Sequence, residues 1–294
     1  MISLKRVSIG AAGACALFSS TAFAQQLPTP LGLASQLDLE CHAAQGPAPV
    51  AGVFLRQLNP VLQGQLPNQV AQIGPLEDVC VPVAKNQQIP GPNAFNIARW
   101  VDLACYDATA PEVSVEVHLS HLNPVLGALP DEDVTIKKLT QFCAPVKKNN
   151  VNPPAAVHAI VKHFDFACYE LEEPTQDVNF PLGLSHLNPV IQGMNLPNRA
   201  VKMRRATELC VPVGKGNQAI PPAALQYISW LDFLKYKLTP LNAASVPAYQ
   251  APIPLVLTHL NPMFANAPPF ATVLQAPLKL LVPVAKNNVL PPND

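Results

Sequence analysis

The sequence is poor in charge. Charged residues make up only 13% of its 294 residues, and 19 Lys and Arg balance 19 Asp and Glu. This is roughly half of the charged fraction of an average soluble domain. A neutral, charge-poor chain has no electrostatic footprint for nucleic acid and no polybasic segment for anionic lipid. Beyond residue 24 no uninterrupted apolar run reaches about 18 residues, the length typical of a membrane helix. We therefore expect no nucleic-acid partner and no transmembrane segment.

Proline and apolar residues are abundant instead. The chain has 34 prolines, more than twice the usual share, and 49% of its residues are apolar. This apolar content is too high for disorder driven by charge repulsion. Low charge together with high proline favours short extended segments that are separated by rigid turns.

Residues 1–24 have the pattern of a signal peptide. Two basic residues precede the apolar stretch 7–18, and Ala22-Phe23-Ala24 matches the small-x-small cleavage motif. The apolar stretch is too short to span a bilayer as a helix. We expect cleavage after Ala24 and export to the periplasm, the medium or the cell surface. The alternative is lipidation of Cys15, although the residue three positions before it is Ala rather than a large aliphatic residue.

Three short blocks recur four times in the same order. The first block is Leu37-Asp38-Leu39-Glu40-Cys41, Asp102-Leu103-Ala104-Cys105-Tyr106, Asp165-Phe166-Ala167-Cys168-Tyr169 and Asp232-Phe233-Leu234-Lys235-Tyr236. The second block is Leu-Asn-Pro at 58–60, 122–124, 187–189 and 260–262. The third block begins Val81-Pro82-Val83, Ala144-Pro145-Val146, Val211-Pro212-Val213 and Val282-Pro283-Val284. Such self-similarity predicts tandem repeats, which we call segments 1 to 4: 25–97, 98–161, 162–224 and the cysteine-free 225–294.

Cleavage would leave six of the seven cysteines, an even number in an exported chain, which predicts disulfides with fifteen possible connectivities. Segment 4 narrows this choice because it lacks both cysteines, with Lys235 and Leu281 in their places. If the two cysteines of each segment pair with one another, the loss of both from segment 4 leaves every remaining cysteine with a partner. If cysteines of neighbouring segments paired instead, this loss would leave one cysteine without a partner. We therefore predict three disulfides: Cys41–Cys80, Cys105–Cys143 and Cys168–Cys210.

Hydrophobic alternation predicts the fold class. Apolar and polar residues alternate over 113–120, and similar patterns occur at 178–184 and 253–257. This period of two is typical of a half-buried strand. The following Asn-Pro ends the strand, and the Asn side chain can cap a turn. Pro-Pro pairs between the segments indicate stiff connectors with a helical turn after them. The predicted fold is all-β, with four tandem antiparallel modules of about 65 residues, each with a marginal core of its own.

These residues resemble an uncharacterised tandem repeat of exported proteins from environmental bacteria. The repeat has a Cys-Tyr strand and ends in Leu-Cys-x-Pro-x-x-Lys-Asn. Cys105-Tyr106 with 142–149 and Cys168-Tyr169 with 209–215 are similar to this pattern, whereas His42 replaces the expected Tyr in segment 1. The resemblance spans the mature chain and implies export and modularity, but no activity.

The most tempting catalytic motif is Ser-His before Leu-Asn-Pro. Ser120-His121 and Ser185-His186 have it, and segment 4 has Thr258-His259. Neighbours on a strand point to opposite faces, so these pairs are poorly placed for a hydrolytic dyad. Metal binding by His121, His186 and His259 would require four segments to bring their strand ends together, and no local ligand pair supports it. We favour a structural role in which each imidazole bonds to a nearby backbone carbonyl, and we assign no catalytic residue, metal or cofactor.

The remaining repeated polar residues are an aspartate and a lysine. Asp38, Asp102, Asp165 and Asp232 could serve as calcium ligands or as acid–base groups, but each stands alone in sequence. We expect them to bond the backbone or the recurrent lysine. The lysines, expected in solvated turns, are Lys85, Lys148, Lys215 and Lys286. Trp100 and Trp230 occupy the same repeat position, which favours core packing over sugar stacking.

Two classes of function remain open. The first is an exported non-enzymatic repeat protein, a binding, adhesion or envelope-structural module with an extracellular or envelope ligand. Repetition favours it because linked weak sites gain avidity. The second is an extracellular hydrolase or metal-dependent enzyme whose site is assembled between segments. An enzyme would need one asymmetric site, and the sequence shows no cluster of polar residues unique to one segment.

Peptide mapping of the exported protein without reduction tests the disulfide prediction. We expect crosslinked peptides that join Cys41 to Cys80, Cys105 to Cys143 and Cys168 to Cys210, with no free thiol. A link between Cys80 and Cys105, or between Cys143 and Cys168, would contradict pairing within segments.

Overall fold

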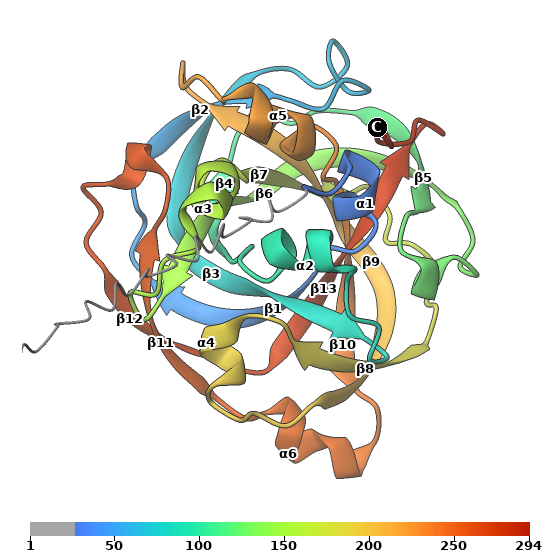
Figure 1. Cartoon of the computed structure of the whole chain (residues 1–294). Helices are drawn as coiled ribbons and strands as arrows, with labels where there is room; N and C mark the ends of the chain where they lie inside the picture. Colours follow the sequence, from blue (N-terminus) through green and yellow to red (C-terminus); the bar gives the residue numbers. More distant parts are fainter. Residues whose placement is uncertain (1–26) are drawn as a thin grey trace, which may run out of the picture.

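All strands within residues 27–294 belong to one sheet. The computed structural model describes residues 27–294, so the predicted signal peptide and Cys15 lie outside the described residues. The sheet has 13 strands, and every strand pairing in it is antiparallel (Figure 1). The predicted all-β class is confirmed. Within residues 27–294, none of the helices has the length and apolar character needed to cross a lipid bilayer.

Eight of the strands form a closed ring. They are β1 (Asp38–Gly46), β3 (Gln69–Lys85), β4 (Leu103–Thr109), β6 (Glu132–Lys148), β7 (Phe166–Leu171), β9 (Arg199–Lys215), β10 (Phe233–Pro240) and β13 (Pro277–Lys286). Each strand pairs with the next in this order, and β13 pairs with β1. Each segment contributes two consecutive strands. The ring therefore buries the backbone edges that a single segment would expose.

Five further strands lie outside the ring, at the periphery of the view in Figure 1. They are β2 (Gly52–Gln57), β5 (Val115–His121), β8 (Phe180–His186), β11 (Ile253–His259) and β12 (Phe270–Leu274). Each of β2, β5, β8 and β11 pairs within its own segment and also with the ring two segments away: β2 with β9, β5 with β13, β8 with β3, and β11 with β6. The segments are therefore interlocked, and the predicted boundaries between them stay a prediction.

Short helices gather over the centre of the ring in Figure 1. They are α1 (Pro30–Ala34), α2 (Pro92–Ala98), α3 (Ala155–Val161) and α5 (Pro222–Ile228). Each begins at or directly after a proline, whose fixed φ angle suits the first helical position. This confirms the helical turns expected after the proline-rich connectors. The remaining helices, α4 (Pro189–Gln192) and α6 (Val246–Tyr249), lie in loops outside the ring, as do single 3₁₀ turns at 124–126, 243–245 and 262–264.

The alternation of side chains along the ring separates two hydrophobic clusters. One cluster combines the six cysteines with Leu39, Leu103, Phe166 and the buried faces of the four central helices, so it fills the ring. The other contains Tyr106, Tyr169, Tyr236 and the buried residues of the outer strands, so it lies between the ring and those strands. Adjacent strand residues point to opposite faces, which places each Cys and its following Tyr in different clusters.

The turns follow from local side-chain chemistry. The Asn of each Leu-Asn-Pro block accepts a hydrogen bond from the backbone N–H two residues later, at 2.8 Å in segment 1 and 2.9 Å in the others. This confirms the predicted turn cap. Directly after the recurrent lysine of segments 1, 2 and 4, the chain reverses through two residues with positive φ, such as Asn149 at 48° and Asn150 at 61°, whereas in segment 3 only Gly216 has positive φ, at 49°. Asn tolerates this left-handed conformation better than most residues do.

The ring holds the three predicted disulfides: Cys41–Cys80, Cys105–Cys143 and Cys168–Cys210. In each pair the two cysteines lie directly opposite one another on neighbouring strands of one segment. Sulfur atoms of successive bridges also lie close together, at 3.8 Å between Cys80 and Cys105 and 3.9 Å between Cys143 and Cys168. The three bridges thus lie side by side and form a disulfide belt inside the ring. The belt has one gap, where Lys235 faces Leu281.

Replacing both cysteines of one bridge by alanine tests its contribution to stability. The Cys105–Cys143 bridge closes a separation of 38 residues. Its removal should lower the free energy of unfolding by about 4 kcal/mol, because the unfolded chain regains the entropy of an open loop. Urea unfolding of the double variant measures this loss. The other two double variants should lose similar amounts, and a loss below about 1 kcal/mol in all three would contradict the loop-entropy account.

Candidate functional site

The four repeated aspartates and lysines meet as buried pairs. Lys85 Nζ lies 2.5 Å from Asp38 Oδ1. The same contact joins Lys148 to Asp102, Lys215 to Asp165 and Lys286 to Asp232. No side chain of the four pairs is more than 4% exposed. The expected contact between aspartate and lysine is therefore confirmed, whereas the expectation that these lysines lie in solvated turns is wrong.

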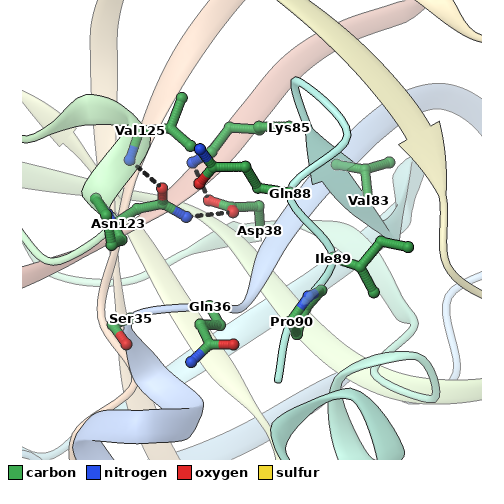
Figure 2. Close-up of a pocket in the computed structure, with 11 residues that line it drawn as sticks. Ser35, Gln36, Asp38, Val83, Lys85, Gln88, Ile89, Pro90, Asn123 and Val125 are labelled. Carbon is green, nitrogen blue, oxygen red and sulfur yellow. Dashed lines mark hydrogen bonds and ion pairs between the residues drawn. The ribbon is translucent and has the colours of Figure 1, made fainter. Parts of the chain in front are cut away.

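In three of the four pairs an asparagine from the next segment bonds to the aspartate. Asn123 Nδ2 donates to Asp38 Oδ2 at 2.7 Å, as Figure 2 shows. The equivalent distances are 2.7 Å from Asn188 to Asp102 and 2.6 Å from Asn59 to Asp232. In segment 4, Asn261 Nδ2 instead donates to the carbonyl of Lys162 and to Gln218 Oε1. The three complete triads therefore connect neighbouring segments through their buried carboxyl groups.

Burial shifts both partners of each pair toward their uncharged forms. It raises the pKa of all four aspartates, to about 6 for Asp165 and Asp232, and attraction to the lysines only partly offsets this. Burial likewise lowers the pKa of the four lysines. A charge that is removed from water loses its solvation, which favours transfer of the proton from amine to carboxyl. A cavity of about 140 Å³ lies beside the Asp38 triad (Figure 2).

The histidines before Leu-Asn-Pro lie apart, each on a different outer strand and with its own partner. His121 Nε2 is 3.1 Å from the Tyr236 hydroxyl, and His259 Nε2 is 2.9 Å from the Tyr106 hydroxyl. At the matching place in segment 1, Gln57 Nε2 lies 3.3 Å from the hydroxyl of Tyr169. These contacts join segments that are two apart. The expected backbone carbonyl partner is therefore wrong for these residues, because the rings bond to side chains.

The structure also contains an asymmetric polar cluster that sequence reasoning missed. Arg199 Nη1 donates to Glu40 Oε2 at 3.1 Å and to His186 Nε2 at 2.5 Å. His42 Nε2 lies 3.2 Å from Glu40 Oε2, and its Nδ1 bonds the carbonyl of Gln275 at 2.7 Å. Side-chain exposure is at most 7% for this set. The sequence did contain a signal for this cluster, because Glu40 and His42 depart from the repeat. The other segments have Ala or Leu in place of Glu40 and Tyr in place of His42.

Electrostatics keep the carboxylate of this cluster ionised. Burial alone would raise the pKa of Glu40, but His42, Arg199 and His186 together outweigh it and lower the pKa to about 2. Burial is also the main reason why the pKa of His186 falls to about 3. Glu40 Oε1 and His186 Nδ1 have no hydrogen-bond partner within the described chain. The cluster joins β1 of segment 1 to β8 and β9 of segment 3 through side-chain contacts.

A second polar cluster fills the gap in the disulfide belt. Lys235 Nζ bonds Gln141 Oε1 and lies 3.2 Å from Glu208 Oε2 and 3.4 Å from Asp78 Oδ2. Lys279 Nζ contacts the same two carboxylates at 3.1 and 3.3 Å. Burial opposes ionisation of Asp78 and Glu208, but the two lysines outweigh it and hold both carboxyl pKa values below their usual range. Two positive and two negative charges thus balance where the fourth bridge is missing.

No metal centre is found in residues 27–294: no three His, Cys, Asp or Glu side chains there are arranged to hold a metal ion. In that part of the chain no hydrogen bond joins Ser120 to His121 or Ser185 to His186. The three histidines considered for metal binding or hydrolysis, His121, His186 and His259, thus have separate side-chain partners.

A cleft of about 670 Å³ lies at the surface between segments 1, 3 and 4. Its polar lining consists of Arg56, Gln57, Gln63, Asn217, Gln218 and Ser229, and Trp230 forms part of its wall together with Leu58, Pro60, Ala219, Ile220 and Leu225. Arg56 donates to the carbonyls of Gly216 and Gln218 at 2.8 and 2.9 Å, which fixes the rim. Trp100, at the matching repeat position, packs against the core inside the ring. Core packing therefore accounts for Trp100, whereas Trp230 faces a cleft.

Replacing His259 by Gln tests the histidine–tyrosine contacts. Burial lowers the pKa of His259 from 6.5 to about 4, so the unfolded chain binds more protons in that window and stability falls as the pH falls. His259→Gln should remove about 2 kcal/mol of this acid destabilisation between pH 7 and about pH 4. Gln is a matched replacement because Gln57 bonds Tyr169 in the same way. Urea unfolding at the two pH values measures the difference.

The control for this experiment is His118→Gln. His118 pairs with Asp133 at the surface, which raises the pKa of its imidazole instead of lowering it. This variant should not reduce the loss of stability in acid. Equal acid sensitivity of the wild type and the His259→Gln variant would contradict the assignment of His259 as a neutral buried partner of Tyr106.

Comparison with known proteins adds no family. No protein-family model, no curated protein and no solved structure matches this chain. The likeness to an exported tandem repeat therefore stays a resemblance of motifs, and the geometry of the described residues is the basis for a functional proposal.

Proposed function

We propose that the protein is an exported, non-enzymatic binding protein whose cleft at Trp230 takes a neutral saccharide of the cell envelope. The observation that carries this proposal is the composition of the cleft, in which an indole lies among amide and hydroxyl side chains. Its volume of about 670 Å³ falls in the range of small-molecule binding sites.

The chemistry of the cleft suits a ligand with an apolar face and a hydroxyl-rich edge. The indole of Trp230 offers a flat apolar surface. The amides of Gln63 and Asn217 can donate and accept hydrogen bonds without carrying charge, and the hydroxyl of Ser229, which donates to the carbonyl of Leu225, can accept one. The only charged side chain, Arg56, is already bonded to two backbone carbonyls of the rim. A sugar ring matches this combination better than an ionic ligand does.

Export is supported by two independent features. The sequence of residues 1–24 matches a signal peptide. Three disulfides also fit an oxidising compartment, because reductants in the cytosol keep thiols reduced. An envelope saccharide is a ligand that such a protein would meet.

An enzyme receives less support from the same residues. Nucleophilic catalysis needs a hydroxyl or thiol beside a base and within reach of substrate. The asymmetric cluster around Glu40 and Arg199 contains neither group, and its side chains are at most 7% exposed. The contacts of this cluster are directed at one another, which favours a role in joining segments 1 and 3.

Tryptophan fluorescence can test the proposed site directly, because the chain has only two tryptophans. Trp100→Phe leaves Trp230 as the single reporter. Titration of this variant with neutral envelope oligosaccharides should shift or quench its emission and yield a saturable curve. Trp230→Ala should reduce the affinity at least tenfold, measured by calorimetry, because it removes the apolar face of the cleft.

The control is Trp100→Ala, which changes the matching position of segment 2 but not the cleft. It should retain saccharide binding if the variant folds, as near-ultraviolet circular dichroism would show. Absence of binding to every saccharide tested, or binding that survives Trp230→Ala unchanged, would rule out the proposed site.

A further inference from the structure

The three complete triads bring an amine, a carboxyl group and an amide donor together inside an apolar core. We propose that Lys85, Lys148 and Lys286 form intramolecular amide bonds with Asp38, Asp102 and Asp232 after the chain has folded. Each bond would join an aspartate at or directly before the start of one ring strand to the lysine at the end of the next ring strand of the same segment. The proposal concerns covalent structure and does not depend on the function of the cleft.

Geometry gives the first argument. Lys85 Nζ lies 2.5 Å from Asp38 Oδ1, and the other two pairs are in direct contact. Both members of each pair are at least 96% buried. Holding two reactants together in this way converts a bimolecular reaction into a unimolecular one and accelerates it by orders of magnitude. The folded chain therefore supplies the proximity that free side chains in water lack.

Protonation gives the second argument. Amide formation requires an uncharged amine as nucleophile and an uncharged carboxyl group as electrophile. Burial lowers the pKa of Lys85, Lys148 and Lys286 and raises that of their aspartate partners, to about 6 for Asp232. Both shifts favour the neutral pair, which is the reactive form.

The asparagine gives the third argument. In the Asp38 triad, the asparagine Nδ2 donates a hydrogen bond to the carboxyl oxygen Oδ2. The other carboxyl oxygen, Oδ1, faces Lys85. A donor at Oδ2 stabilises the negative charge that develops when the amine adds to the carboxyl carbon. Asp165 lacks such a donor, because Asn261 bonds other groups. Lys215 Nζ also lies 4.6 Å from the centre of the Phe264 ring, a contact that favours the protonated amine.

The reaction balances without any further reagent. The lysine Nζ bonds to the aspartate Cγ, the bond from Cγ to one carboxyl oxygen breaks, and that oxygen leaves as water with one proton from the acid and one from the amine. No oxidant, reductant or cofactor is consumed. In segment 1 the cavity of about 140 Å³ beside Asp38, Lys85 and Asn123 has room for the departing water (Figure 2).

Intact mass of the wild-type protein is the primary test, and it needs no variant. The mature protein should be lighter than its sequence by three water molecules, after allowance for the hydrogens lost in three disulfides. Peptide mapping after reduction should then find branched peptides that join the lysine and aspartate of each triad. A loss of water that maps to any of the three pairs establishes the chemistry for that pair, whereas full mass with only linear peptides overturns the proposal.

Two further outcomes are decisive. Loss of ammonia with a link between lysine and asparagine would overturn the assignment of aspartate as the acceptor. The Lys215–Asp165 pair is the internal comparison, because it has the same two side chains without the asparagine donor. It should remain unlinked, and a bond formed there in equal yield would contradict the role given to the asparagine.

Matched variants confirm the assignment in segment 2. Lys148→Met removes the amine, so the protein should regain the mass of one water molecule. The control is Lys147→Met, since this neighbouring lysine bonds Asn152 at the surface and contacts no aspartate. The control should retain the wild-type loss of three waters. An unchanged mass deficit in the Lys148→Met variant would overturn the bond at Asp102.

Discussion

β1 pairs with β3 on one side and with β13 on the other, and this second pairing joins segment 1 to segment 4. Small units of about 65 residues cannot bury much apolar surface alone. Closure places the buried side chains of all four segments in one shared interior, together with the faces of the short helices α1, α2, α3 and α5. The same closure removes the exposed edges of the ring strands, and it brings the disulfides close enough for sulfur atoms of neighbouring bridges to touch.

The polar residues that recur in the four segments lie mainly in the interior of the protein. The residues shared by the segments are the Asp–Lys pairs, the capping asparagines and the aromatic partners of the histidines, and nearly all of them are buried. A buried polar group must find its hydrogen-bond partner inside the protein, because an unpaired group is costly. The triads and the histidine–tyrosine contacts join different segments, so they require correct closure of the ring.

The features that the sequence predicted correctly are those that depend on local patterns of residues. Alternation over 113–120 identified β5, and the joint loss of two cysteines at Lys235 and Leu281 identified the disulfide pairing. It could not predict which strands would meet, because alternation defines two faces of a strand but not its partner. The burial of Lys85 was missed for the same reason: Lys-Asn reads locally as a solvated turn, and its partner Asp38 is 47 residues away. Trp230 shares a repeat position with Trp100, so position alone could not separate a cleft residue from a core residue.

The departures from the repeat come in compensating sets, which explains why the segments are not interchangeable. Lys235 introduces a buried positive charge where the other segments have cysteine, and Asp78 and Glu208 face it from two other segments. Glu40 introduces a buried negative charge, and Arg199 faces it from segment 3. A buried charge without its partner would cost several kcal/mol, so neither side of such a pair tolerates loss of the other. Each departure therefore fixes which segments must face one another, and identical copies would leave that arrangement unspecified.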